Sequence, residues 1–320
     1  MTKTSKTTPT SGTNPQTPVV FLGSGPVAAK SLALLQQYLE VDTVITKPST
    51  VKEMTSIAKG ACVYSVNSQA DLDELILARS FDTKLGVLID FGVIVSQKVI
   101  DSFELGIINS HFSLLPEWRG ADPITFSVLS GQGKTGVSLM VLVAAMDEGP
   151  VIACGVQELS GKETTPELTD RLILLSDGLL KKELPRYIAG DSIGIEQAEL
   201  AKLMPNYPNK PSYSRKLTKS DGVLDFTKPA KQLEREVRAY MDWPKSTAQI
   251  AGKDVIVLEA SVDDTTKGDV GKVFRTSDKK IGVYCSEGAL IITMLKPAGK
   301  QAMSSEGFLA GYGQSIPFEG

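Results

Sequence analysis

Histidine, cysteine and long apolar runs are scarce in this chain of 320 residues, and each shortage excludes a class of protein. The single histidine, His111, rules out every site that needs two imidazoles, such as HExxH metalloproteases, three-histidine zinc centres and the two-histidine iron triad. The cysteines Cys62, Cys154 and Cys285 lie far apart without a CxxC pair, which argues against a disulfide framework or a zinc ribbon. No run approaches the about 20 apolar residues that span a bilayer, and no signal-peptide pattern opens the chain. We therefore expect a cytoplasmic protein with neither a metal nor a membrane segment.

The composition is that of a globular protein larger than one ordinary domain. Hydrophobic residues make up 42% of the chain and charged residues 22%, which is enough apolar surface for a packed core. A single core stops growing near roughly 250–300 residues, so two domains are expected. The 34 basic and 37 acidic residues give a net charge of −3, which excludes a histone-like polycation but allows a local basic face.

Strands and helices alternate in the first part of the chain. A tail at 1–17 precedes them; it contains seven threonines but no arginine and no amphipathic apolar face, so it is expected to be flexible rather than a transit peptide. The alternation predicts a Rossmann-like α/β domain over 18–190, with a mostly parallel sheet flanked by helices. Strands are expected at 19–22, 41–46, 62–66, 85–89, 106–109, 137–143 and 151–159, and helices at 27–39, 50–59, 69–79 and 167–188.

The remainder of the chain differs in pattern and in charge. Residues 191–213 contain several prolines and few periodic apolar positions, which is typical of a linker. A helix at 228–240 and short strands at 247–250, 255–258, 271–275, 281–285 and 289–294 then predict a small OB-like β-barrel domain over 214–320. Residues 208–320 hold 17 basic and 14 acidic side chains, against 17 and 23 in residues 1–207. A mildly basic barrel beside an acidic domain suits a nucleic-acid substrate.

A glycine-rich turn, Gly23-Ser24-Gly25-Pro26, follows the first expected strand and opens a helix. The same position holds the pyrophosphate in dinucleotide-binding folds. Those folds also need an acidic residue at the end of the second strand, and this chain has Thr46-Lys47-Pro48 there, while Asp42 stands at the start of the strand. The pattern therefore favours a tight β–α turn over an NAD site.

The neighbourhood of His111 carries most of the chemistry in the sequence. Asn109 and His111 lie two residues apart at the end of a strand, where ligands gather in parallel sheets, and the strand period turns both to one face. Their N–H groups can bracket a developing oxyanion. A stiff loop at 112–123 follows, and farther on a turn at 144–150 presents Asp147 and Glu148. Taken singly, each of these residues is also explained as a hydrogen-bonded filler or a turn residue.

Together these residues match a known family. Residues 109–124 read NSHFSLLPEWRGADPI and residues 135–152 read TGVSLMVLVAAMDEGPVI, which closely resembles the folate-dependent formyltransferases with their N-x-H, SLLP, R-G-A-x-P-I and D-x-G motifs. The far end of the chain is similar to the members of this family that act on methionyl-tRNA. That likeness rests on SRKLTKSDGVLDF at 214–226, KPA at 228–230, VRAY at 237–240, the Trp-Pro pair at 243–244, GKQAM at 299–303 and FLAG at 308–311.

The resemblance implies that the formyl group of 10-formyltetrahydrofolate is transferred to the α-amine of methionine on initiator methionyl-tRNA, by a monomer and without a metal. Asn109 and protonated His111 would stabilise negative charge on the formyl oxygen, and Asp147 would relay the amine proton through a water. The pterin would be held largely by backbone groups. The substrate-binding residues implied are Val87, Leu88, Ile89, Asp90, Phe91, Gly92 and Val93, together with Ser113, Leu114, Leu115, Pro116 and Arg119.

The chain departs from the family pattern at two places, and three rival functions fit parts of the sequence. Only the short stretch 47–52 stands where the family carries a longer basic insertion that contacts the tRNA acceptor end, and Asp90 replaces a residue that is more often apolar. A formyltransferase for an amino sugar or a ribonucleotide would share the three catalytic residues but would not need the basic barrel. The second rival is a hydride-transferring dehydrogenase, and the third is a catalytically silent RNA-binding protein of the same fold.

Overall fold

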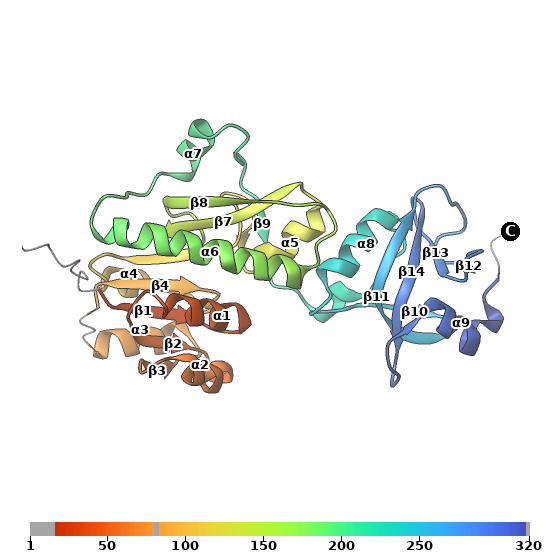
Figure 1. Ribbon diagram of the computed structural model, residues 1–320, viewed down its shortest axis with the longest axis horizontal. Coiled ribbons are helices and arrows are strands. Elements are labelled where there is room, and N and C mark those ends of the chain that lie inside the picture. The colour runs from red at the N-terminus through yellow and green to blue at the C-terminus, as the bar shows by residue number, and fades with distance from the viewer. Residues whose placement is uncertain (1–16, 80–82, 318–320) are drawn as a thin grey trace, which may run out of the picture. The chain divides into compact units, whose positions relative to one another are not determined.

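The computed structural model describes residues 17–79 and 83–317, and Figure 1 shows their helices and strands. The chain forms two compact units, which are described one at a time. The first contains the described residues up to Ser110 with Leu139–Ala145 and Asp177–Gly194, and the second contains His111–Ser138, Met146–Ser176 and Ile195 onward. The expected flexible tail at 1–17 lies, except for Thr17, outside the described residues. The domain limits expected near 190 and 214 stay a prediction.

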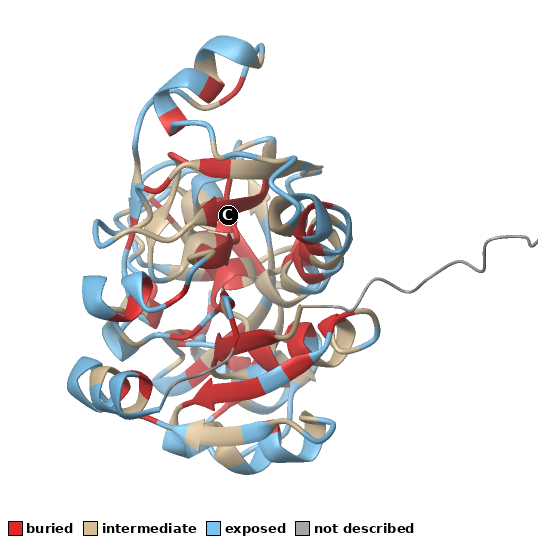
Figure 2. Ribbon diagram, turned by 90° about the vertical axis from the view of Figure 1, so that its left-hand side faces the viewer, coloured by how far each residue is buried: buried red, intermediate tan, exposed pale blue. Residues whose placement is uncertain are grey.

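The first unit is built on parallel strands. Neighbouring strands pair in parallel in the order β3 (Cys62–Ser65), β2 (Val41–Thr46), β1 (Val19–Gly23), β4 (Leu85–Ile89) and β5 (Ile107–His111). The strand order of the same sheet goes on through β7 (Lys134–Val141) and β8 (Val151–Glu158), and β8 belongs to the second unit. Every residue of β1 and of β5 is buried, as expected for parallel strands covered on both faces. The buried strands are red in Figure 2.

Helices follow these strands and confirm the expected α/β class. They are α1 (Pro26–Leu35), the 3-10 turn η1 (Pro48–Thr50), α2 (Val51–Ile57), α3 (Gln69–Ala78), α4 (Gln97–Asp101) and the long α6 (Thr165–Ile188). Serine side chains cap two of them: Ser68 accepts the Asp71 N–H at the start of α3, and Ser96 accepts the Val99 N–H at the start of α4. None of the helices in the described part of the chain is both long and apolar enough to cross a membrane.

The glycine-rich turn between β1 and α1 is accounted for by close packing. A Cβ at Gly23 would lie 2.6 Å from the Phe21 ring and 2.7 Å from the Ile89 carbonyl oxygen, so only glycine fits. The Ser24 N–H donates to the Asp90 carbonyl at 2.9 Å, which ties the turn to the end of β4. Gly25 has a φ of 89°, a conformation that favours glycine. This is the tight β–α turn that the sequence favours.

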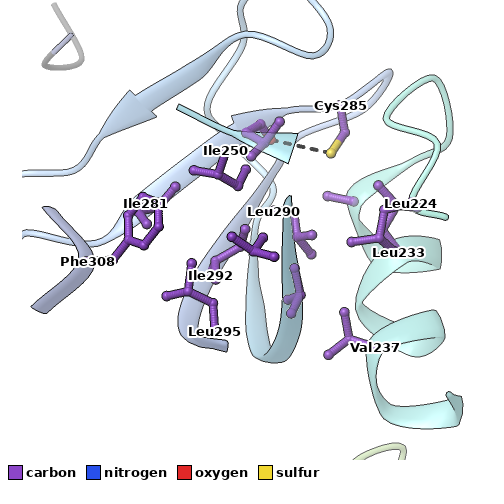
Figure 3. Packing of buried hydrophobic residues seen from close by; sticks show 14 of the residues in the cluster. Leu224, Leu233, Val237, Ile250, Ile281, Cys285, Leu290, Ile292, Leu295 and Phe308 are labelled. Carbon is purple, nitrogen blue, oxygen red and sulfur yellow. Dashed lines mark hydrogen bonds between the residues drawn. The ribbon is translucent and has the colours of Figure 1, made fainter. Parts of the chain in front are cut away.

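The C-terminal part of the second unit is an antiparallel sheet covered by helices, which confirms the expected class of a small β-barrel-like fold at this end of the chain. The strand order is β10 (Ser246–Ile250), β11 (Lys253–Asp263), β14 (Ala289–Pro297), β13 (Ile281–Tyr284) and β12 (Val273–Arg275), with β15 (Met303–Ser304) on β14. Helix α8 (Ala230–Ala239) packs on β11 and β14, and α9 (Ser305–Tyr312) packs on β14. In Figure 3, Leu233 and Val237 of α8 face Ile292 of β14 across this core, and Phe308 of α9 belongs to the same cluster.

Several short elements lie where the sequence gives no periodic signal. They are β6 (Arg119–Gly120), α5 (Pro123–Ser130), α7 (Gln197–Leu203), β9 (Tyr213–Ser214) and the 3-10 turns η2 (Lys219–Gly222) and η3 (Gly313–Ser315). The segment 191–213, expected as a linker, therefore contains α7, and Ile195 exchanges two backbone hydrogen bonds with Val151. β6 and β9 pair with each other although they lie far apart in the sequence.

A buried carboxylate organises the loop between β8 and α6. Glu163 is 4% exposed, and its side chain accepts the N–H groups of Ser160 at 2.8 Å, Gly161 at 3.0 Å and Lys162 at 3.1 Å. Its carbonyl oxygen accepts a hydrogen bond from Arg238 of α8 at 2.6 Å. Burial by itself raises the pKa of Glu163, but the hydrogen bonds outweigh burial and hold the pKa at about 2, below the ordinary 4.5.

The lowered pKa predicts a pH-dependent contribution to stability. Because the folded state binds the Glu163 proton less tightly than the unfolded state, the contribution is full above about pH 4.5 and is lost as the pH falls toward 2. We expect Glu163→Gln to lower the free energy of unfolding at pH 7 by about 1–3 kcal/mol, with a smaller difference at pH 3. Urea denaturation at both pH values measures this. The exposed Glu158→Gln is the control, and an equal loss at both pH values would contradict the assignment.

Candidate active site

His111 ends strand β5, two residues beyond the strand end that the sequence predicts, and its side chain is buried. The ring has two acceptor partners: Nε2 lies 3.0 Å from the Trp118 carbonyl oxygen, and Nδ1 lies 3.6 Å from Oδ1 of Asp147. A carbonyl oxygen can only accept, so Nε2 is the donor in the contact with Trp118.

The two carboxylate oxygens of Asp147 have different partners. Its Oδ1 faces His111, and its Oδ2 accepts the backbone N–H of Gly120 at 2.7 Å. The residue lies in the loop after β7 with a φ of 51°, in the left-handed region that aspartate tolerates better than most side chains. The structure thus brings together two of the three residues that the sequence singles out as catalytic, His111 and Asp147.

Asn109, the third of these residues, lies on β5 two positions before His111 and is 7% exposed. β5 pairs in parallel with β4, in a register that sets Asn109 opposite Leu88. By the two-residue period of a strand, the side chains at 109 and 111 leave the same face. The carboxamide and the imidazole are therefore oriented together by the strand itself.

The residues after His111 are anchored through one serine. Ser138 of β7 donates from its hydroxyl to the Ser113 carbonyl at 2.8 Å and accepts the Leu115 N–H at 3.0 Å. The side chains of Ser113, Leu114 and Leu115 are at most 1% exposed, and Pro116 is buried as well.

The predicted pterin-binding stretch alternates between buried and exposed residues. The side chains of Val87, Ile89 and Phe91 are at most 2% exposed, whereas Asp90 and Gly92 are exposed with φ values of 48° and 65°. The left-handed backbone explains why aspartate is suited to position 90, because its short polar side chain tolerates this conformation. The remaining members, Leu88 and Val93, are partly buried and pack with Leu142 against the apolar core of the first unit.

The guanidinium of Arg119 donates hydrogen bonds to two side chains of the protein. Its Nη1 donates to Glu148 at 2.9 Å and its Nη2 donates to Oε1 of Gln197 at 2.7 Å. Gln197, the first residue of α7, is 5% exposed and donates from Nε2 to the carbonyl oxygens of Asp147 at 2.8 Å and Gly149 at 3.0 Å. The sequence reasoning missed Gln197, because it lies in the expected linker and nothing local distinguishes it from a surface glutamine.

The pairing of β6 with β9 fixes the backbone groups that contact His111 and Asp147. Gly120 has a φ of 114°, and a Cβ there would lie 2.3 Å from the Ser214 carbonyl oxygen. The Trp118 N–H donates to the Ser212 hydroxyl at 2.9 Å, and the Asp122 N–H donates to the Ser214 hydroxyl at 3.1 Å. The Gly120 amide and the Trp118 carbonyl were also missed, since backbone groups leave no mark in a sequence.

Two further carboxyl groups lie on the same loop. Burial raises the pKa of Glu117, with the charge of Lys134 opposing the shift. Burial also raises the pKa of Asp122, and hydrogen bonds from Thr125 oppose it. Within residues 17–79 and 83–317, no group of three histidine, cysteine or acidic side chains is arranged to hold a metal ion.

The fold and this site define an α/β enzyme whose polar groups gather where β5 and β7 end. The family description "Formyl transferase" matches residues 19–181, and "Formyl transferase, C-terminal domain" matches residues 216–313. A methionyl-tRNA formyltransferase of Pseudomonas entomophila (strain L48) is 33% identical over 299 residues, which cover 89% of this chain and 93% of that protein. One of Myxococcus xanthus (strain DK1622) is 31% identical over 309 residues, covering 92% and 95%. The chain belongs to the formyl transferase family, among the methionyl-tRNA formyltransferases.

Solved structures support the same fold at lower sequence identity. WlaRD, a sugar 3N-formyl transferase solved in the presence of dTDP and 5-N-formyl-THF, matches with a TM-score of 0.62 at 17% identity over 90% of this chain and 100% of that one. HypX from Aquifex aeolicus in complex with tetrahydrofolic acid matches with a TM-score of 0.60 at 16% identity. That match covers 94% of this chain and 48% of HypX, so this chain spans about half the length of HypX.

The contact between Gly120 and Ser214 predicts that a methyl group is not tolerated there. We expect Gly120→Ala to lower the free energy of unfolding by about 1–3 kcal/mol, because the backbone is left-handed and the carbonyl of Ser214 cannot move aside without breaking the β6–β9 pair. Gly133→Ala is the matched control, since no atom lies within 4 Å of the added Cβ. Urea denaturation compares the two variants, and equal stabilities would refute the packing argument.

Proposed function

We propose that the protein transfers the formyl group of 10-formyltetrahydrofolate to the α-amine of methionine on initiator methionyl-tRNA, for translation initiation. The observation that carries the proposal is the 33% identity to a methionyl-tRNA formyltransferase over 89% of the chain. The buried His111–Asp147 pair supports it, because formyl transfer needs charge stabilisation and one proton transfer but no metal.

In the proposed mechanism the neutral amine of methionine attacks the formyl carbon, and negative charge develops on the formyl oxygen. Asn109 offers N–H donors to this oxygen, and the imidazolium of His111 stabilises it by its positive charge. Asp147 keeps the imidazolium paired and relays the proton of the attacking amine through a water. The C–N bond to tetrahydrofolate then breaks, and the leaving nitrogen takes up a proton.

We assign the donor site to residues 87–93 and 113–116. The left-handed backbone at the exposed Asp90 and Gly92, with the buried Phe91 between them, supports hydrogen bonding by backbone groups there. This agrees with a pterin, whose edge carries both donors and acceptors. Within the set predicted from the sequence, Arg119 differs from the others, because its guanidinium already bonds Glu148 and Gln197.

We assign tRNA binding to the C-terminal region. A groove of about 550 Å³ runs along β10 and β11 and the end of β14, and the exposed lysines Lys219 and Lys296 line it. Ammonium groups in an open groove suit the phosphates of a nucleic-acid backbone. The catalytic part would then span 18–190 and the tRNA-binding part 214–320, in a monomer of the cytoplasm.

A formylation assay tests the function directly. The full-length protein is mixed with charged initiator tRNA and a formyl donor labelled in the formyl group, and label on methionine is the expected result. A nucleotide-linked amino sugar is the competing acceptor, and label on the sugar alone would contradict the proposal. A fluorescence titration with NADH tests for a dehydrogenase, and no binding of NADH is expected.

Two alanine substitutions test the catalytic assignment. His111→Ala and Asn109→Ala are each expected to lower kcat by about 10²–10⁴-fold, because each removes a group that stabilises the formyl oxygen. Binding of tRNA should change little. Steady-state kinetics and a filter-binding assay measure both quantities, and a kcat like that of the wild type in either variant would remove that residue from the mechanism.

The groove predicts a steep salt dependence of tRNA affinity. Each lysine that neutralises one phosphate contributes about 0.9 to the slope of log K against log salt concentration, so Lys219→Ala with Lys296→Ala should reduce the slope by about 1–2. Lys279→Ala is the control, because this lysine pairs with Glu306 and does not line the groove. Binding titrations across salt concentrations measure the slope, and an unchanged slope in the double variant would remove the groove from the interface.

A further inference from the structure

Gln197 makes three hydrogen bonds, and two of them reach the loop that bears Asp147. Its Nε2 donates to the carbonyl oxygens of Asp147 and Gly149, and its Oε1 accepts from Arg119. The side chain is 5% exposed, so these bonds form largely out of water. Only an amide satisfies this set: a carboxylate would face two carbonyl oxygens, and an apolar side chain would leave them without this donor.

Asp147 is held from two sides. Its carboxylate is bonded to Gly120, and its backbone carbonyl is bonded to Gln197. The residue has a φ of 51°, a conformation that persists where surrounding contacts determine it. Gln197 contributes such a contact from a part of the chain that lies between the two family matches, at 19–181 and 216–313.

We propose that Gln197 is a positioning residue for formyl transfer, which fixes the Asp147 loop so that the carboxylate meets His111. Arg119 completes the arrangement, because it joins Gln197 to Glu148 of the same loop and is the neighbour of Gly120. Arg119 thereby acts on the catalytic loop. The inference rests on the proposed function, since it assigns Gln197 a part in that reaction.

Removal of Gln197 is therefore expected to lower the rate of formyl transfer without weakening the binding of substrates. Gln197 touches neither the reacting atoms nor the groove on β10 and β11, so its removal should leave KM for both substrates within about twofold. A misplacement of a catalytic group by about 1 Å costs as much as about 10²-fold in rate. We therefore expect Gln197→Met, which preserves the volume of the side chain, to lower kcat by about 10–100-fold.

The lone histidine provides a readout that does not depend on turnover. Since His111 is the only imidazole in the chain, its ¹⁵N signals are identified without assignment. Loosening of the Asp147 loop in Gln197→Met should move the Nδ1 signal, whereas a purely structural packing role would leave it in place. Gln197→Glu, which retains an acceptor for Arg119 but loses both donors, should move the same signal.

Glu199→Gln is the matched control, because Glu199 lies on the same helix, is exposed and pairs only with Lys202 among the described ion pairs. A lower kcat with unchanged KM and a moved imidazole signal in Gln197→Met, but not in Glu199→Gln, would support the proposal. A kcat like that of the wild type, or an unmoved signal, would overturn it. If the wild-type protein formylates no methionyl-tRNA, the proposed function fails, while the imidazole signal still tests the positioning.

Discussion

The carboxylate of Asp147 is the group on which the geometry of the candidate site depends. One oxygen accepts the Gly120 N–H and the other faces Nδ1 of His111, while the side chains of His111 and Asp147 are only 6% and 12% exposed. A charge so far from water is costly unless it is paired and hydrogen-bonded. The Gly120 N–H and the facing ring of His111 therefore offset the cost of burying the Asp147 carboxylate.

The elements around the His111–Asp147 pair position its members and their hydrogen-bonding partners. β5 places His111, the loop after β7 places Asp147, and the β6–β9 pair places the Gly120 amide against Oδ2 of Asp147. Trp118 turns its carbonyl toward Nε2 with a φ of 53°, so the second ring nitrogen is also satisfied. Three left-handed residues, Trp118, Gly120 and Asp147, meet in this small region, as expected where surrounding contacts determine a functional backbone.

The strands that are determined by local residue patterns were predictable from the sequence. The strands at 41–46 and 85–89 agree with the structure at both ends, because runs of buried residues bounded by turns mark such strands. The pair β6–β9 and the role of Gln197 were not predictable, since their partners lie dozens of residues away and backbone donors have no sequence signature. The motif residues His111 and Asp147 were recognisable only as a combination, for each alone resembles an ordinary turn or filler residue.

The segment between the two family matches therefore contributes contacts to the candidate site, besides joining the two matched parts of the chain. Ser212 and Ser214 hold the backbone of residues 118–122, and Gln197 holds the carbonyl of Asp147, yet all three lie outside 19–181 and 216–313. A catalytic part that ended at residue 181 would keep its motif residues but lose the contacts that orient them. Since acid–base groups act only when held in place, the contacts from segment 195–214 bear directly on the catalytic role that we propose for the motif residues.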